Sequence, residues 1–247
     1  MDMWLFYEAT HWRHRYLNPI SEPGVRDLEQ ILDLKPGARV LDIACGHAQM
    51  LIDMVERYGI RGVGVDLSPY HSKRAIENVR ENVPEADLEI VVGRGEEYES
   101  DRPFDVAMCI GASWIWQGYA GTLKALTGFV KPGGFVVAGG PYWRMAPPSG
   151  YVEAEDFAAE DFTTLAAYDE SARELGLRPL WMRGASEQEW DAYEMTQLAS
   201  FDAWARENPD HPERAEIEAK LRANKSSYLR WGRDYLGFAI WVFRTPE

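Results

Sequence analysis

Two patterns of apolar and polar residues alternate along the chain from residue 39 onward. Short runs that are apolar throughout are separated by longer stretches in which apolar residues recur every three or four positions. The runs predict strands at 39–44, 62–66, 88–92, 105–110 and 135–139. The longer stretches predict helices at 49–59, 69–82 and 121–130, the last ended by a turn at 131–134. Apolar strands that alternate with helices indicate a doubly wound α/β fold with a parallel sheet covered on both faces.

The last hundred residues follow a different pattern. Two further strands are expected at 176–184 and 237–244, and about fifty residues of helical pattern lie between them. We interpret residues 187–234, approximately, as a helical insertion over one edge of the sheet. Its large aromatic residues recur at helical spacing, which favours core packing over a partner surface, and they are Trp190, Tyr193, Phe201 and Trp204.

The first 35 residues are also helical in pattern. A helix is expected at 21–32, because Ser21 is a good amino-terminal cap and Pro23 suits the first turn. We therefore predict an amino-terminal helical cap at 1–35 and a main domain at 36–247.

Composition limits the possible classes of protein. Apolar residues make up 46% of the 247 residues and aromatic residues 13%, which is typical of a folded globular chain. No apolar run reaches the ~18 residues of a membrane span and no leader pattern opens the sequence, so a cytoplasmic location is expected. Cys45 and Cys109 lie in apolar segments, which favours neither a disulfide nor a metal site. A net charge of −14 opposes nucleic-acid binding, and a monomer or homodimer is expected.

The stretch VLDIACGHA at 40–48 carries the strongest chemical signal. A buried strand breaks at Gly46, and Asp42 lies four positions earlier, where a carboxylate is costly unless it is used. Ligands of open α/β sheets bind at the carboxyl ends of the strands, and Gly46 permits close backbone approach there. Asp66 ends the second strand twenty residues after Gly46, a distance that suits a carboxylate for ribose hydroxyls. The pattern predicts a nucleoside site.

A dinucleotide site would need two further glycines, but Ala48 and Leu51 occupy those positions. The chain instead resembles the class I S-adenosylmethionine-dependent methyltransferases over residues 36–140. The residues that carry this resemblance are VLDIACGHA (40–48), GVGVDLS (62–68) and VKPGGFVV (130–137). Three further stretches are similar to an uncharacterised bacterial small-molecule branch, and they are HRYLNP (14–19), GASWI (111–115) and GGPYWR (139–144).

The resemblance implies a Rossmann-like seven-stranded sheet, mostly parallel with an antiparallel last strand, and S-adenosylmethionine as cofactor. The residues that it implies for the cofactor are Asp42, Ala44, Gly46, His47, Asp66, Leu67, Gly95, Glu96 and Ile110. Asp66 would bind the ribose, and Asp42 would orient the loop or reach the methionine ammonium through water. Arg94 occupies the usual acid position, so adenine would contact the Gly95 and Glu96 backbone or the Glu96 carboxylate.

Residues that bind the methyl acceptor are expected after the fourth and fifth strands, and they are Trp114, Trp143 and Arg144. The alternative for the aromatic residues after the fifth strand is that they pack the helical insertion against the sheet. A base is needed only when the nucleophile carries a proton, and His14 or His11 could serve, since the opening segment is expected to fold over the site. Tyr142 and Glu194 are weaker candidates for the same role.

The sequence thus predicts a methyltransferase that acts on a small molecule by in-line displacement. The motif that amino-group methyltransferases carry after the fourth strand is absent, and a thiol, amine or hydroxyl acceptor would each fit. Two alternatives stay open: a catalytically silent S-adenosylmethionine-binding sensor or scaffold, and an NAD(P)-dependent oxidoreductase.

Overall fold

Seven strands form one sheet in the order β3-β2-β1-β4-β5-β7-β6 in the computed structural model, which describes residues 1–155 and 159–247. The strands are β1 (Arg39–Ile43), β2 (Arg61–Asp66), β3 (Leu88–Val92), β4 (Phe104–Ile110), β5 (Val130–Trp143), β6 (Arg178–Gly184) and β7 (Leu236–Arg244). β7 is antiparallel to both of its neighbours, whereas the pairs formed by β1 to β5 are parallel. The predicted seven-stranded, Rossmann-like sheet with an antiparallel last strand is confirmed.

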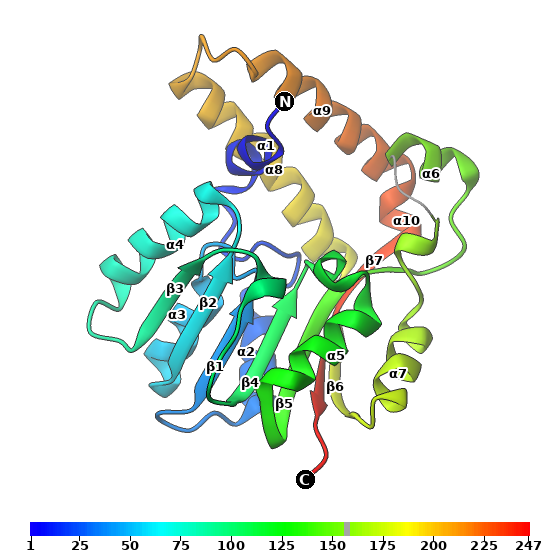
Figure 1. Cartoon of the computed structure of the whole chain (residues 1–247). Helices are drawn as coiled ribbons and strands as arrows, with labels where there is room; N and C mark the ends of the chain where they lie inside the picture. The colour runs from blue at the N-terminus through cyan, green and yellow to red at the C-terminus, as the bar shows by residue number, and fades with distance from the viewer. Residues whose placement is uncertain (156–158) are drawn as a thin grey trace.

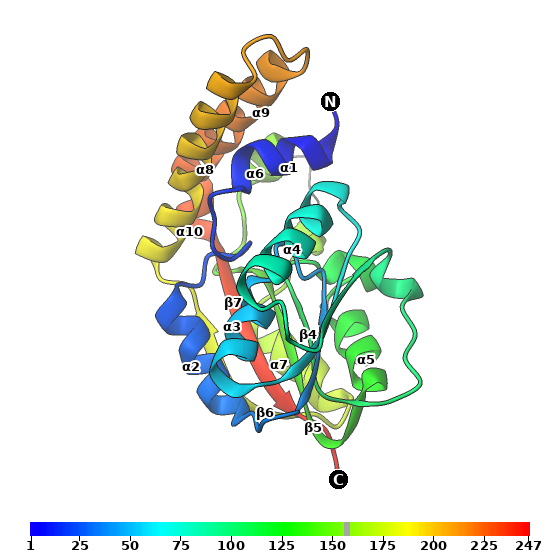
Figure 2. The same ribbon diagram turned by 90° about the vertical axis from the view of Figure 1, so that its left-hand side faces the viewer.

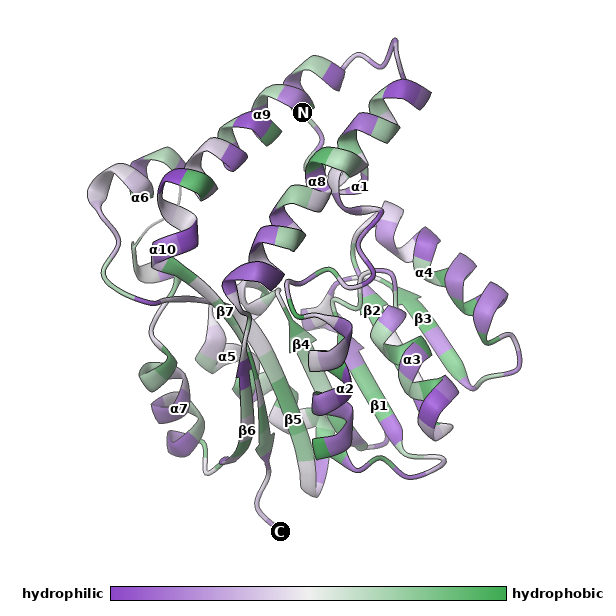
Figure 3. Ribbon diagram, turned by 180° about the vertical axis from the view of Figure 1, so that it is seen from behind, coloured by the Kyte–Doolittle hydropathy of each residue, from purple (hydrophilic) through white to green (hydrophobic). Residues whose placement is uncertain are grey.

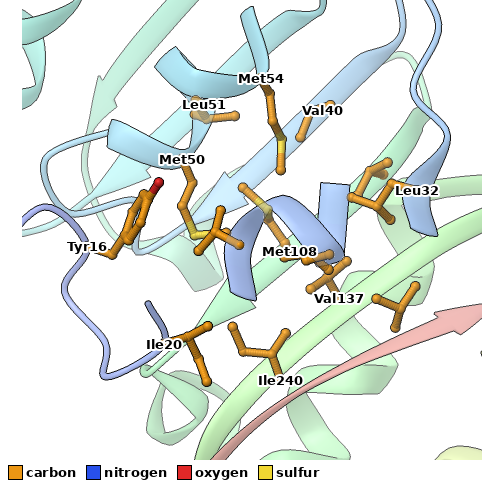
Figure 4. Packing of buried hydrophobic residues seen from close by; sticks show 14 of the residues in the cluster. Tyr16, Ile20, Leu32, Val40, Met50, Leu51, Met54, Met108, Val137 and Ile240 are labelled. Atoms are coloured by element: carbon orange, nitrogen blue, oxygen red, sulfur yellow. The ribbon is translucent and has the colours of Figure 1, made fainter. Parts of the chain in front are cut away.

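Helices cover both faces of this sheet (Figures 1 and 2). One face carries α2 (Glu22–Leu32), α3 (Gln49–Tyr58) and α4 (Pro69–Asn82), and Figure 3 shows α2 and α3 in front of the strands. The other face carries α5 (Tyr119–Phe129) and α7 (Leu165–Glu174). Each face of the sheet has its own hydrophobic core. Because side chains alternate along a strand, Val40 lies in one core and its neighbour Leu41 lies in the other. Figure 4 shows Val40, Met108 and Val137 packed with Leu32 of α2 and Leu51 of α3.

A separate helical layer lies beyond the carboxyl ends of the parallel strands. It contains α1 (Met3–His11), α8 (Glu187–Glu207) and α9 (Arg214–Ser227), and Figures 1 and 2 show α1 lying against α8. Its small core includes Phe6, Phe201 and Ile217, one from each helix. The aromatic stripe predicted in the insertion thus contributes to packing, with Phe201 and Trp204 at this core.

Shorter elements complete the chain. They are α6 (Ser149–Glu155), α10 (Arg233–Tyr235), the 3₁₀ turns η1 (Gly95–Glu97), η2 (Ser113–Trp116) and η3 (Ala159–Asp161), and the π-helical turn η4 (Tyr228–Gly232). The predicted cap at 1–35 divides in two, since α1 joins the helical layer while α2 packs on the sheet. None of the helices in the described residues is long and apolar enough to cross a membrane.

The start of α8 is tied to two other parts of the fold through Glu189. Ser186 and Glu189 form a reciprocal capping box. The Glu189 carboxylate also accepts hydrogen bonds from the amide and hydroxyl of Ser21, before α2, and pairs with Arg183 of β6 at 3.1 Å. Although burial opposes the shift, these donors lower the pKa of Glu189 to about 2. The helical layer is therefore anchored to the sheet domain by a charged junction.

Candidate active site

A cavity of about 300 Å³ lies where the carboxyl ends of β1, β2 and β4 meet the helical layer. Its lining falls into two groups. The sheet side supplies Ala44, Gly46, Val65, Asp66, Leu67, Gly93, Arg94, Gly95, Glu96, Ile110, Gly111, Ala112, Trp114 and Ile115. The roof and the helical side supply Trp4, Tyr7, His11, Leu17, His71 and Tyr193. Because parallel strands end at one edge, the sheet brings residues far apart in sequence to one place.

The loop after β1 forms the floor of the cavity. Its backbone enters the left-handed region at Ala44 (φ 63°), Gly46 (φ 56°) and Ala48 (φ 59°), where non-glycine residues are uncommon. A Cβ atom on Gly46 would lie 2.7 Å from Cδ1 of Leu17, so a larger residue would have to displace that side chain and also adopt a left-handed backbone. The backbone of this loop therefore borders the cavity directly, as the binding of a nucleoside requires.

Asp66 holds this loop against β2. Its Oδ2 accepts a hydrogen bond from the Gly46 amide at 2.8 Å, and its Oδ1 accepts one from the Ser68 amide at 2.9 Å. Burial raises the pKa of Asp66, while His71 and the two amides oppose that shift. Each carboxylate oxygen retains further acceptor capacity, and Asp66 lines the cavity. The predicted ribose acid is therefore fixed in place and still able to accept hydroxyl hydrogens.

Asp42 faces a smaller pocket of about 30 Å³ that shares Ala44, Gly46 and Ile110 with the main cavity. Asp42 is 5% exposed, and among the described residues burial and the charge of Asp66, with no hydrogen-bond donor, set the pKa of its carboxylate. Burial, and secondarily the charge of Asp66, raises the pKa of Asp42 well above its usual range. A buried acid without a partner is costly in the free protein, so this position suits a cationic ligand group.

The opposite end of the cavity is formed by η1 and η2. A Cβ atom on Gly95 would lie 2.5 Å from Cγ2 of Ile43, so the chain there must be glycine. Arg94 forms ion pairs with Glu96 and Glu97, and its charge is thereby balanced locally. Trp114 of η2 is 63% exposed and lines the cavity, which places a large free ring at this end.

A strap between α1 and α2 passes over the glycine loop. Arg15 and the Tyr16 hydroxyl donate hydrogen bonds to the buried Asp53 carboxylate of α3, at 2.7 Å and 2.5 Å. Gln49 donates to the same carboxylate at 2.8 Å. This network holds Leu17 above Gly46 and so forms part of the roof. This network is hard to predict from the sequence, because its ion pair joins Arg15 to Asp53, which lie far apart in the chain.

Four histidines lie near the cavity, in different surroundings. Both ring nitrogens of His14 contact backbone carbonyls, of His11 at 3.1 Å and of Tyr193 at 2.8 Å, and His14 does not line the main cavity. Burial lowers the pKa of His14, so the ring is neutral with one N–H and one lone pair, and both nitrogens face carbonyls rather than the main cavity. This geometry does not fit the predicted role of His14 as the base. His47 and His71 each have a buried Nε2 without a partner in the described residues, and His11 lines the main cavity.

Three predicted residues at the end of β5 do not line the main cavity. The Tyr142 ring crosses β7, where a Cβ atom on Gly237 would lie 2.3 Å from its Cζ. Trp143 is buried and donates from Nε1 to the Ala159 carbonyl at 2.7 Å. Arg144 lines neither the main cavity nor the smaller pocket. The alternative, that these aromatic residues serve packing, describes their positions better than the predicted catalytic and acceptor roles.

The remaining predicted residues are brought together. The main cavity is lined by Ala44, Gly46, Asp66, Leu67, Gly95, Glu96, Ile110 and Trp114, and the smaller pocket by Asp42 and His47. Glu194 instead pairs with the buried Lys225 in the helical layer. Sequence reasoning missed Trp4, Tyr7, Leu17 and His71. No group of three or more metal-ligating side chains that could hold an ion occurs in the part of the chain that the structure describes.

Known proteins resemble this chain along its whole length. Residues 40–134 match the family described as Methyltransferase domain. Uncharacterized protein YjhP of Escherichia coli (strain K12) is 30% identical over 98% of both chains. The crystal structure of a SAM-dependent methyltransferase from Geobacter sulfurreducens in complex with S-adenosyl-L-homocysteine has a TM-score of 0.91, with 31% identity and 98% of both chains covered. Phosphoethanolamine N-methyltransferase 1 of Zea mays is 26% identical over 88% of this chain and 44% of its own length.

Proposed function

The chain belongs to the S-adenosylmethionine-dependent methyltransferases, and on that premise we propose that it methylates a small molecule held at the helical side of the cavity. The predicted cofactor, S-adenosylmethionine, is confirmed by the S-adenosylhomocysteine bound in similar structures. It supplies an electrophilic methyl group on a sulfonium sulfur. The nicotinamide-dependent alternative is left without support.

The observation that carries the proposal is the arrangement of Asp42, Gly46 and Asp66 around one loop. Asp66 keeps acceptor capacity for ribose hydroxyls while it fixes the Gly46 amide. Asp42 has no partner in the described residues and faces the pocket where a methionine ammonium would fit. The cavity then continues from the glycine loop to Gly95 and Trp114, and we expect the adenine to lie there, which would give Trp114 a role at the cofactor instead of the predicted one at the methyl acceptor. Leu67 lines the same end.

The protein's own contribution to the reaction is alignment and exclusion of water. In-line displacement at a methyl carbon gains from a fixed approach angle and from a dry site. Leu17, held by the strap, and Tyr7 of α1 form a roof that shields the cavity. The helical layer therefore acts as the acceptor-binding part of the molecule, and the sheet as the cofactor-binding part.

Isothermal titration tests the cofactor assignment. We expect saturable binding of S-adenosylmethionine and none of NADH by the intact chain. Asp66→Asn should weaken binding ~10-fold or more, because a hydrogen bond to a charged group contributes about 1.5–3 kcal/mol. Asp87→Asn is the matched control, since Asp87 is an exposed acid that pairs with Arg61 outside the cavity. Equal affinity in Asp66→Asn and the control would contradict the assignment.

A catalytically silent binding protein is the remaining alternative. It predicts tight S-adenosylmethionine binding without release of S-adenosylhomocysteine in the presence of any acceptor. Mass-spectrometric detection of S-adenosylhomocysteine across a library of small nucleophiles separates the two functions, because methyl transfer produces it in equal amount to the methylated product.

A further inference from the structure

Among the described histidines near the cavity, His11 combines a ring that lines the main cavity with a side-chain hydrogen bond that fixes its Nδ1. Its Nδ1 lies 2.7 Å from Oγ1 of Thr10, and the ring also has a hydrogen bond with the backbone of Tyr7. The Nε2 atoms of His47 and His71, in contrast, are buried. Both nitrogens of His14 are engaged with carbonyls.

The Thr10 hydroxyl fixes which nitrogen of His11 carries the proton. Oγ1 of Thr10 also lies 2.7 Å from the Phe6 carbonyl oxygen, which can only accept a hydrogen bond. The hydroxyl has one hydrogen, so it donates to Phe6 and must accept from Nδ1 of His11. The neutral ring is therefore protonated at Nδ1, and its lone pair is on Nε2. The pair Thr10 and His11 is buried, so solvent does not compete for these contacts.

Resting on the proposed function, we propose that the acceptor is an uncharged, planar molecule with a hydroxyl or thiol group, and that Nε2 of His11 takes its proton. Thr10 is the positioning residue that keeps this lone pair in place. A base is required for such acceptors because a neutral hydroxyl or thiol is a weak nucleophile before its proton leaves.

The walls beside His11 suit a planar, uncharged acceptor. The rings of Tyr7 and Tyr193 flank His11 with centroid distances of 5.4 Å and 5.7 Å, each inclined by 60°. Trp4 lines the same side of the cavity. Aromatic rings stack or pack edge-on against another ring at such separations. Burial raises the pKa of Tyr193, which therefore keeps its hydroxyl hydrogen as a donor.

The charges around the cavity disfavour a charged acceptor. Arg94 is the only lysine or arginine among the described lining residues, and it is paired with Glu96 and Glu97 at the cofactor end. A phosphate would need an available cation. The lining carboxylates, Asp66 and Glu96, lie on the sheet side and are engaged there, Asp66 by two backbone amides and Glu96 by Arg94. An acceptor of the phosphoethanolamine type, the substrate named for the maize relative, therefore does not fit this cavity.

The proton balance of the step is simple. The acceptor's proton passes to Nε2 of His11 as its oxygen or sulfur forms a bond to the methyl carbon. The bond from that carbon to the sulfonium sulfur breaks, and its electron pair stays on the sulfur of neutral S-adenosylhomocysteine. His11 then returns the proton to water. Burial, with the nearby charges of His14, Lys225 and His71, lowers the pKa of His11 well below its usual value, so the ring starts the cycle neutral.

The experiment uses four proteins and four acceptor probes. The proteins are the intact wild type, His11→Gln, Thr10→Val and Thr10→Ser. The probes are phenol and phenylmethanethiol, whose hydroxyl and thiol keep their protons at neutral pH, with phosphoethanolamine and benzylamine as charged counterparts. Formation of S-adenosylhomocysteine gives kcat and KM, and calorimetry gives the affinity for S-adenosylmethionine. Nitrogen NMR of the free protein gives the protonation of the His11 ring independently of turnover.

We expect methylation of phenol or phenylmethanethiol, with kcat lowered ~100-fold or more in His11→Gln and cofactor affinity unchanged. Thr10→Val should lower kcat ~10-fold and change its pH profile, because the ring can then rotate or exchange its proton. Thr10→Ser keeps the hydroxyl and should restore both. NMR should show a protonated Nδ1 and an unprotonated Nε2 in the wild type and in Thr10→Ser.

Three results would overturn the inference: methylation confined to the charged probes, full kcat in His11→Gln, or no methylation of either neutral probe by protein that binds S-adenosylmethionine. Wild-type protein that fails to bind S-adenosylmethionine would count against the proposed function instead. The NMR result is separate from both, and an Nε2-protonated ring would remove the assigned role of Thr10.

Discussion

Replacement of Asp42 by asparagine should have opposite effects on stability and on cofactor affinity. The change keeps the shape of the side chain and removes its charge. Asp42 is 5% exposed, has no hydrogen-bond donor in the described residues and is close enough to Asp66 for that charge to raise its pKa. No protein hydrogen bond is lost on substitution, so the free protein should gain stability.

The magnitude of each effect follows from this environment. An unsatisfied buried polar group costs about 1–3 kcal/mol, and more when charged. Asparagine retains part of that cost, so we expect a gain of ~1 kcal/mol, or a rise in Tm of ~2–4 °C for a chain of this size. Loss of a charged contact to the methionine ammonium should cost about 1.5–3 kcal/mol, which weakens S-adenosylmethionine ~10-fold to ~150-fold.

The effect of Asp42→Asn on stability should depend on pH, because Asp42 can lose a proton and asparagine cannot. The pKa of Asp42 is raised in the folded state, so the acid is stabilised there in its protonated form. That contribution is present at low pH, below the unfolded pKa, and is lost as pH rises through the folded pKa. The stability gained by Asp42→Asn should therefore be small in acid and grow towards higher pH.

Thermal scans at several pH values and calorimetric titration measure these effects. 5′-Methylthioadenosine is the control ligand, because it has the nucleoside but lacks the amino-acid group. It should bind wild type and Asp42→Asn with the same affinity, within ~2-fold. If Asp42→Asn bound S-adenosylmethionine as tightly as the wild type, or lost both ligands equally, Asp42 would not be the site of the ammonium group.

Two further substitutions test the glycine loop and the helical junction. Gly46→Ala should cost at least ~1–2 kcal/mol in thermal or urea unfolding, since its φ is 56° and the new Cβ would lie 2.7 Å from Cδ1 of Leu17. Gly128→Ala, in α5 with no atom within 4 Å of the new Cβ, should instead be stabilising, and equal losses at both sites would refute the strain argument. Glu189→Gln should destabilise the protein by ~1 kcal/mol above pH 4.5, because the Glu189 pKa is lowered to about 2 and its side chain is partly exposed. In urea melts this difference should shrink as pH falls towards 2, and a difference independent of pH would contradict it.

The cofactor side of the site was predictable because its signals are local. An apolar strand that breaks at Gly46, and an acid that ends the next strand, are readable in the sequence. The parallel sheet then places Asp66 beside the loop. Gly95 and Ile110 were implied by the resemblance to the methyltransferases rather than by these patterns. The prediction for Asp66, in contrast, depends on strand order and on the spacing from Gly46.

The acceptor side was not predictable because it depends on long-range packing. β5 continues to Trp143, well past the predicted end at 139, and its antiparallel pairing with β7 sets Tyr142 opposite Gly237. Which way those side chains face cannot be determined from a short motif. The choice between His14 and His11 likewise depends on the packing of α1 against α8, which turns His14 onto the Tyr193 carbonyl.

A crystal structure with S-adenosylhomocysteine tests the central claim most directly. The account predicts ribose hydroxyls within ~3 Å of the Asp66 carboxylate, the amino group facing Asp42, and the sulfur towards the side of the cavity that carries His11. A nucleoside bound elsewhere, or one whose ribose makes no contact with Asp66, would contradict it.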